Sequence, residues 1–300
     1  MPLAPEIRTV SASVMGTPYS AALGERPPVA AALPVGSVLR GRVDAVPETE
    51  ATPAVPSDKT PEFRSDVTVE LVRSSAHDSD VLFAARVSTM GELTLDGAQA
   101  SADGAQATKG AGLINYLMRD RHGSPFEHNS MTFYVQAPIF VFREFMRHRI
   151  ASYNEESGRY RELLPVFYVP GPERRLVQVG KPGAYDFIEG TPEQTALAVS
   201  EGERVATLAY ESYQRMLDAG IAREVARMVL PLSIYSSMYV TVNARSLMNF
   251  LSLRTKHEDS HFPSFPQREI ELVAEQMESA WKTLMPLTHA AFEQNGRVAP

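Results

Sequence analysis

The chain has 300 residues, a net charge of −7 at neutral pH and no cysteine. Its hydrophobic content of 44% is ample for the core of one large domain or two small ones. The absence of cysteine excludes disulfides, thiolate metal sites, iron–sulfur clusters and every mechanism that needs a cysteine nucleophile. The negative charge argues against a surface built as a whole to hold nucleic acid, although it leaves room for local basic clusters.

The chain carries no sequence signal for a membrane. It has no run of about 18 apolar residues, which a spanning helix would need. Its start lacks a basic segment followed by a continuous apolar one, the pattern of a secretory signal. We therefore expect a cytoplasmic protein.

Composition divides the chain near residue 61. Residues 1–61 hold ten of the 22 prolines, mixed with alanine, valine and serine. Such a composition seldom builds a core. We predict a flexible N-terminal extension over residues 1–61 and one folded domain over residues 62–300.

The first periodic segments of the folded domain predict a strand followed by a helix. Apolar and polar residues alternate over residues 67–71, which is the pattern of a half-buried strand. Asp78 or Ser79 suits the cap position of a helix that ends at Ser88.

A tandem near-repeat, DGAQASA followed by DGAQATK, occupies residues 96–109. We predict a duplicated, flexible loop, because Gly, Ala and Asp give it little to bury. Lys109 falls one place too early for the phosphate-loop pattern, and no strand precedes it. Apolar residues then return at helical spacing, so we expect a helix from Leu113 to Gly123.

A second strand and a buried helix lead to the most polar stretch of the chain. Residues 131–135 alternate as a strand. The apolar residues 137–146 predict a helix entered through Pro138, which suits the first helical turn. The next residues, 147–160, read RHRIASYNEESGRY. Because Ser, Asn and Gly favour caps and turns, we predict that the helix delivers a polar loop.

The C-terminal half alternates helical and strand patterns. Residues 167–190 predict irregular structure, and Thr191 caps a long helix that Gly220 ends. We expect the buried stripe of that helix to contain Leu197, Val205, Leu208, Ala209, Tyr213, Met216 and Leu217. The remaining predicted elements are a helix over residues 222–230, a strand over 234–242, a helix over 243–254 and a helix over 267–294.

Residues 257–261, HEDSH, satisfy the HExxH pattern of zinc proteases. That chemistry requires both histidines on one face of a stable helix. Asp259 and Ser260 are weak helix formers, and Pro263 and Pro266 follow closely. We therefore predict neither a helix nor a zinc site here.

The polar stretch at residues 147–160 has the composition of an anion site. Arginine offers planar, bidentate donors that suit phosphate and carboxylate. The hydroxyls, amide and carboxylate among its arginines suit an anion with further polar edges, such as a nucleotide. A solvated face held by salt bridges is the alternative.

The spacing RHRxxSxNxxSxRY resembles the motif of the flavin-dependent thymidylate synthases. The resemblance extends from about residue 67 to about residue 294, through ARVS, HGSPFEH, REVARMVLPL and VNARSLMNFLSLR. Residues 255–266 resemble an insertion, because the family's loop at that point is shorter. The fixed motif positions are filled here by Arg147, His148, Arg149, Ser152, Asn154, Ser157, Arg159 and Tyr160.

The resemblance implies a fold and a reaction. The fold is α+β, with a central, mostly antiparallel sheet flanked by long helices, in a homotetramer whose sites are shared between subunits. The reaction methylates dUMP to dTMP, with methylenetetrahydrofolate as carbon donor and FAD reduced by NADPH as hydride source. Ordinary thymidylate synthases activate the uracil with a cysteine, so the cysteine-free composition agrees with the flavin-dependent route. No nucleic acid, membrane or metal is expected as a partner.

The resemblance also implies two sets of binding residues. For dUMP they are Glu144, Phe145, Met146, Arg147, Glu155, Glu156, Ser157, Gly158, Arg159, Arg227 and Arg254. For FAD they are Ser88, His122, Ser124, Arg147, His148, Arg149, Glu155, Asn243, Ala244, Arg245 and Asn249. We assign catalysis to Arg254, because C5 of uracil is a poor nucleophile until negative charge builds on the ring, and a nearby cation would stabilise that charge.

Two alternatives remain open from the sequence. Asn243, Arg245, Asn249 and Arg254 stand on an otherwise apolar helix and must find partners, which bound ligands or internal salt bridges would both supply. A non-catalytic RNA- or nucleotide-binding module is the alternative to the enzyme. It would use the basic cluster of Arg143, Arg147, Arg149, Arg159 and Arg161.

Overall fold

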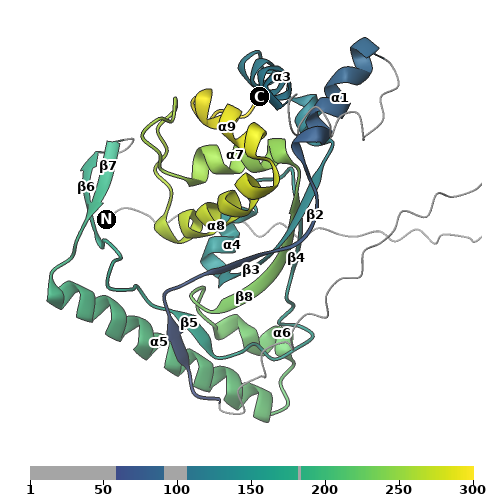
Figure 1. Ribbon diagram of the computed structural model, residues 1–300. Coiled ribbons are helices and arrows are strands. Elements are labelled where there is room, and N and C mark those ends of the chain that lie inside the picture. The colour runs from purple at the N-terminus through teal and green to yellow at the C-terminus, as the bar shows by residue number, and fades with distance from the viewer. Residues whose placement is uncertain (1–58, 91–106, 182–183) are drawn as a thin grey trace, which may run out of the picture. The chain divides into compact units, whose positions relative to one another are not determined.

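The computed structural model of the chain (Figure 1) describes residues 59–90, 107–181 and 184–300. The predicted extension lies outside these residues, except for its last three, and so does the predicted repeat loop up to residue 106. No helix within the described ranges combines the length and the apolar character needed to cross a membrane.

A four-stranded antiparallel sheet forms the centre of the domain, with the strand order β2-β3-β8-β4. Its inner strands alternate buried and partly exposed residues, as expected for strands with one face against a core. Met131, Phe133 and Val135 of β3 are fully buried. The strands are β2 (Thr68–Ser75), β3 (Ser130–Pro138), β8 (Tyr235–Val242) and β4 (Ser152–Glu155).

Helices from both halves of the chain share one large hydrophobic core with this sheet. Figure 1 shows α4, α7, α8 and α9 gathered on one side of the sheet. Trp281 of α8 is fully buried among them. The helices that contribute to this large core are α1 (Asp78–Met90), α3 (Ala107–Arg119), α4 (Ile139–Phe145), α7 (Ala244–Arg254), α8 (Arg268–Leu284) and α9 (Pro286–Gln294).

A second, smaller core lies under the longest helix, α5 (Pro192–Asp218). Phe167, Tyr210 and Tyr213 are its largest buried side chains. Its neighbours include a parallel strand pair and a short helical turn. The remaining elements are β1 (Glu62–Arg64), β5 (Val166–Tyr168), β6 (Val177–Lys181), β7 (Ala184–Ile188), η2 (Ser124–Glu127), α6 (Arg223–Ala226) and η3 (Arg227–Val229).

The structure confirms the three predicted sheet strands and the long capped helix. Thr191 and Gln194 form a reciprocal capping box at the start of α5. The predicted stripe of that helix is wrong in part, because Leu197, Val205 and Leu208 are 62%, 45% and 55% exposed. Only one narrow face of α5 meets the small second core, and it is the face of Tyr210 and Tyr213.

Four other elements differ from the prediction. The segment at residues 167–190 is not irregular throughout, because it contains β5 and the β6–β7 hairpin. Strand β3 runs through Pro138, so α4 begins only at Ile139. The last helix divides at Pro286, whose missing N–H suits the first turn of a new helix. Helix α3 begins at Ala107, inside the repeat.

Asp78 is the first residue of α1 rather than its cap, and it caps a different helix. Its carboxylate accepts hydrogen bonds from the backbone N–H of Leu287 and Thr288 and from the Thr288 hydroxyl, at 2.9, 2.8 and 2.6 Å. These N–H groups belong to the first turn of α9, which lacks partners within the helix. Asp78 therefore ties α1 to α9.

We expect Asp78→Ala to lower the free energy of unfolding by about 2 kcal/mol, because it leaves buried donors without an acceptor. Urea denaturation measures the change. Asp259→Ala removes a carboxylate that is 84% exposed and is the matched control. Its effect should stay within about 0.5 kcal/mol. Equal losses in the two variants would contradict the capping role.

Candidate active site

Arg254 lies in the last turn of α7 and contacts two residues. They are Glu144, near the end of α4, and His148, in the turn that follows α4. Arg254 Nη1 donates to Glu144 Oε2 at 2.5 Å, and its Nε donates to His148 Nε2 at 3.0 Å. The side chains of Arg254 and Glu144 are 19% and 26% exposed. The guanidinium is thus held by two partners while one edge still reaches solvent.

Burial sets the charge states of this group. It lowers the pKa of His148 to about 4, and the positive charge of Arg254 acts in the same direction. His148 is therefore neutral near pH 7, with Nε2 as the acceptor that Arg254 requires. Burial also raises the pKa of Glu144, against the opposing effect of Arg254.

Aromatic side chains fix the turn that carries Glu144 and His148. The Tyr153 hydroxyl donates to the backbone carbonyls of His148 and Phe145, at 2.6 and 3.0 Å. The Phe250 ring stacks on Phe145 with centroids 4.5 Å apart and meets His148 edge-on at 4.9 Å. Phe145 itself is buried, so it supports the site from behind rather than lining it.

An open hollow of about 660 Å³ adjoins this group. Arg143, Arg147 and Met146 line it together with Glu144 and Arg254. In the described part of the chain, neither Arg143 nor Arg147 has a carboxylate within ion-pair distance, and both are exposed. Arg149 is likewise exposed and lacks such a partner there. These cations are available to an anionic ligand.

The middle of the polar motif is a strand, which corrects the predicted loop. Residues Ser152–Glu155 form β4, paired antiparallel with β8. As an edge strand it has one side open to solvent, which accommodates polar side chains. Pairing to β8 overrides the local preference of Ser and Asn for turns.

Beyond β4, a second group of predicted dUMP residues lies near η3. Gly158 is buried so closely that an added Cβ would stand 3.0 Å from the Leu163 side chain and 3.3 Å from that of Arg227. Burial raises the pKa of Glu155, and Arg227 opposes this rise. Among the described residues, Arg227 has no ion-pair partner.

The neighbouring charges of this group are paired with each other. Arg159 binds Glu224 at 3.0 Å, and both side chains are 54% exposed, so this pair contributes little to stability. Glu156 accepts from the Ser237 hydroxyl at 3.2 Å and pairs with Arg161 at 3.0 Å. The Ser157 hydroxyl accepts from the Arg159 N–H at 3.3 Å.

A third group of predicted residues surrounds the start of α7. The Asn243 side chain caps the helix by accepting from the Ser246 N–H at 2.8 Å. Asn129 accepts from the Ala244 N–H, also at 2.8 Å. The Asn249 amide donates to the Arg245 carbonyl at 3.0 Å. Most of these polar groups therefore have internal partners.

Arg245 bridges this group to the end of the chain. It pairs with Glu127 at 2.5 Å and donates to the Pro300 carbonyl at 2.7 Å. It also lies across Gly123, where a Cβ would stand 2.5 Å from the guanidinium, so a larger residue there would displace the Arg245 side chain. His122 packs edge-on against Tyr116 at 5.7 Å, and Ser124 opens η2.

Within one chain, the predicted residues fall into three separate groups. The first and third lie at opposite ends of α7, whose length from Arg245 to Arg254 is roughly 14 Å at the standard rise per residue. The hollow beside Arg254 contains members of the first group, and the cavity beside β4 contains Glu155 and Glu156 of the second. Ser88 lies in α1, and its side chain is outside the described ones.

Sequence reasoning missed Tyr153 and Phe250. Tyr153 stands at a variable position of the motif. The one feature of the sequence that could have identified it is that it is an aromatic residue among small polar ones. The HEDSH segment forms turns rather than a helix, as predicted. Its His261 N–H donates to the Gly296 carbonyl at 2.9 Å.

Comparisons with known proteins agree with the motif. Residues 70–287 match the family described as thymidylate synthase complementing protein. The chain is 68% identical over 240 residues to the flavin-dependent thymidylate synthase of Streptomyces coelicolor, with 80% of this chain and 96% of that protein covered. The flavin-dependent thymidylate synthase of Tropheryma whipplei strain TW08/27 is 62% identical over 240 residues, with 80% and 98% covered.

A solved structure gives the same result in three dimensions. The crystal structure of the UMP/dUMP methylase PolB from Streptomyces cacaoi, bound with 5-Br dUMP, is 57% identical and has a TM-score of 0.73. The match covers 80% of this chain and all of that one. With a family match over most of its length and relatives of this identity, the chain belongs to the flavin-dependent thymidylate synthases, the family of thymidylate synthase complementing proteins.

Proposed function

We propose that the chain converts dUMP to dTMP, with methylenetetrahydrofolate as carbon donor and FAD reduced by NADPH as hydride source. The observation that carries this proposal is the position of Arg254. It is held between Glu144 and a neutral His148, at the edge of a hollow whose arginines have no acidic partner among the described residues.

Arg254 supplies the positive charge for the chemical step. Negative charge develops on the uracil ring as C5 attacks the carbon donor, and a positioned cation near N3 and O2 stabilises it. Two hydrogen-bond partners fix the guanidinium in advance, so little reorganisation accompanies the reaction. Glu144 also lies where it can accept a hydrogen bond from the nucleotide.

The phosphate of dUMP has suitable donors near β4 and η3. Ser157, Arg159 and Arg227 supply a hydroxyl and two guanidinium groups, and the closely packed Gly158 lets the backbone approach. Arg159 is held by Glu224 only through an exposed contact, which a phosphate can displace. Glu155 and Glu156 are the remaining members of this proposed dUMP site.

FAD fits the exposed cations of the motif, because Arg147 and Arg149 have no described acidic partner and guanidinium groups bind phosphate well. When bound, FAD supplies the hydride chemistry. His148 and the residues at the start of α7 would hold the rest of the flavin: His122, Ser124, Asn243, Ala244, Arg245 and Asn249.

We further propose a homotetramer with sites shared between subunits. Two observations support it. The three residue groups lie apart in one chain, so a second chain has to bring complementary groups together. Leu197 and Leu208 of α5, Ile150 within the motif and Met228 of η3 are all more than half exposed, and solvent is an unfavourable environment for such side chains.

The competing RNA-binding module loses support from one ion pair. Arg161, one of its five cations, is bound at 3.0 Å by Glu156, whose side chain is only 19% exposed. The visible spectrum of the purified protein separates the two functions. We expect a yellow protein whose flavin absorbance changes on addition of dUMP, and dTMP formation that requires NADPH and methylenetetrahydrofolate. A colourless protein that takes up no added FAD would overturn the enzyme proposal.

Arg254→Ala should retain FAD and lose turnover by about 100-fold or more, because the developing charge loses its nearest cation. Single-turnover flavin oxidation in the presence of dUMP measures this step. Arg204→Ala removes an exposed, paired arginine of α5 and is the control. Turnover equal to that of the control would remove the catalytic role.

Arg227→Ala should weaken dUMP binding by about tenfold, the typical effect of losing one charge-assisted contact. Titration of the flavin spectrum with dUMP gives the dissociation constant. An unaltered constant would make Arg227 a structural residue.

Tyr153→Phe keeps the ring but removes the hydroxyl that holds the turn after α4. We expect kcat to fall by about tenfold, through a displaced Glu144 and His148, while FAD remains bound. Tyr239→Phe is the control, because its side chain is half exposed on β8. Loss of thermal stability with unchanged kcat would limit Tyr153 to a structural role.

His148 should titrate near pH 4 in the ligand-free protein. Its folded pKa lies below the ordinary value of 6.5, so the contact with Arg254 is fully present above pH 6.5 and is lost as the pH falls through about 4. NMR of ¹³C-labelled histidine measures the titration, with His148→Gln to assign the signal. A midpoint near 6.5 would contradict a buried, neutral imidazole.

A further inference from the structure

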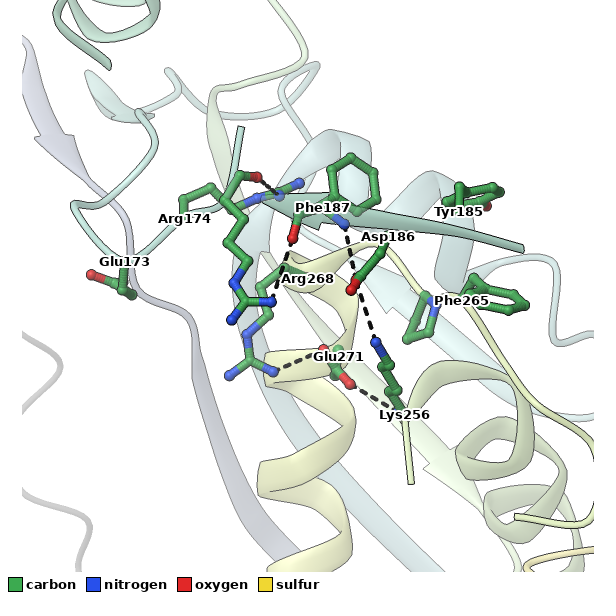
Figure 2. A pocket seen from close by; sticks show the side chains of 11 residues that line it. Glu173, Arg174, Tyr185, Asp186, Phe187, Lys256, Phe265, Arg268 and Glu271 are labelled. Atoms are coloured by element: carbon green, nitrogen blue, oxygen red, sulfur yellow. Dashed lines mark hydrogen bonds and ion pairs between the residues drawn. The ribbon is translucent and has the colours of Figure 1, made fainter. Parts of the chain in front are cut away.

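A second cavity lies outside the groups described above. It opens between the β6–β7 hairpin, the segment that follows α7 and the start of α8 (Figure 2). Its volume is about 270 Å³. Its lining combines aromatic rings with basic side chains, a combination that the Arg254 hollow lacks.

The rings form one wall of this cavity. Tyr185 of the hairpin and Phe265 of the segment after α7 have ring centroids 5.4 Å apart and tilted by 41°. Figure 2 shows them side by side, at the end of the cavity away from Arg174. Phe265 is 37% exposed. A partly exposed ring pair of this kind offers stacking and apolar contact to another flat ring.

Two of the four cations around the cavity are neutralised by protein carboxylates. Arg174 donates to the buried Glu269 at 2.7 Å. Arg268 pairs with Glu271 and Glu275, at 2.9 and 2.6 Å. These cations therefore belong to the architecture of the cavity rather than to its binding capacity.

The other two cations are left with one carboxylate between them. Lys256 reaches Asp186 at 3.4 Å, and both side chains are about 60% exposed. Arg175 donates to the Phe187 carbonyl at 3.4 Å and, within the described chain, has no carboxylate at ion-pair distance. Glu173 points away from the other labelled side chains (Figure 2). Arg175 and Lys256 are thus the two cations of the cavity that share a single, exposed carboxylate.

The cavity also adjoins the catalytic group. Lys256 follows Arg254 by two residues, so their Cα atoms are at most roughly 7 Å apart. The backbone N–H of Lys256 donates to Glu271 at 2.8 Å, which fixes this short connection against α8. The backbone that leads from Arg254 therefore continues directly into the lining of the cavity.

We propose that this cavity binds the end of a co-substrate that carries a flat ring joined to an anionic group. The ring lies against Tyr185 and Phe265, and the anion meets Arg175 and Lys256. The inference rests on the proposed function, because both co-substrates of that reaction have this chemistry. Methylenetetrahydrofolate carries a p-aminobenzoyl ring joined to glutamate carboxylates, and NADPH carries an adenine joined to a ribose phosphate.

Two probe molecules distinguish the two candidate co-substrates. Calorimetric titration of the full-length protein uses p-aminobenzoylglutamate for the folate and adenosine 2′,5′-bisphosphate for NADPH. We expect one of them to bind, and the double variant Arg175→Gln/Lys256→Gln to raise its dissociation constant by about tenfold or more. Arg204→Gln/Lys282→Gln removes the same charge from exposed helix positions and is the matched control.

Steady-state kinetics supply the second readout. In the cavity double variant, KM of the matching co-substrate should rise by the same factor, while kcat, FAD content and dUMP affinity stay unchanged. Probe binding needs neither flavin nor turnover, so a failed enzyme proposal is distinguishable from a failed cavity proposal. Absence of binding by both probes at about 10 mM, or equal losses in the control variant, would overturn the inference.

Discussion

The site depends on one contact set, the hydrogen bonds of the Arg254 guanidinium to Glu144 and His148. A half-buried cation is costly unless its donors are satisfied. Here a carboxylate and a neutral imidazole satisfy it from the same turn. Because α7 presents the arginine, while α4 and the turn that follows it present the two acceptors, the packing of these segments determines the position of the positive charge.

The aromatic support of that turn explains how its geometry is kept. Phe250 stands one turn before Arg254 on α7, and it stacks on Phe145 of α4 while touching the His148 ring. Tyr153 closes the turn from the sheet side through two backbone carbonyls. The hydrophobic core and the polar site are therefore continuous, since the same rings that bury apolar surface also orient the groups that carry charge.

The distribution of polar groups along α7 bears on assembly. Its N-terminal end holds Asn243 and Arg245, which are satisfied within the chain, and its C-terminal end holds Arg254 at the open hollow. A ligand of flavin size can reach from one end to the other, but the described residues of one chain leave the groups in separate places. In the proposed homotetramer, residues from a second subunit would complete one site.

The sequence by itself determined the three main sheet strands and the capped helix α5, because these follow from local period and cap chemistry. The spacing of the RHRxxSxNxxSxRY motif determined the family, and with it the residues proposed to carry the chemistry. Only the tertiary structure decided that Ser152–Glu155, in the middle of this motif, form strand β4, since an edge position beside β8 overrides the turn preference of Ser and Asn. It also decided that Asp78 caps α9 and that Tyr153 holds the His148 turn. Such contacts leave no periodic signal in the sequence, because their residues are far apart in the chain or stand at variable positions of the motif. The packing of the core brings each donor to its acceptor.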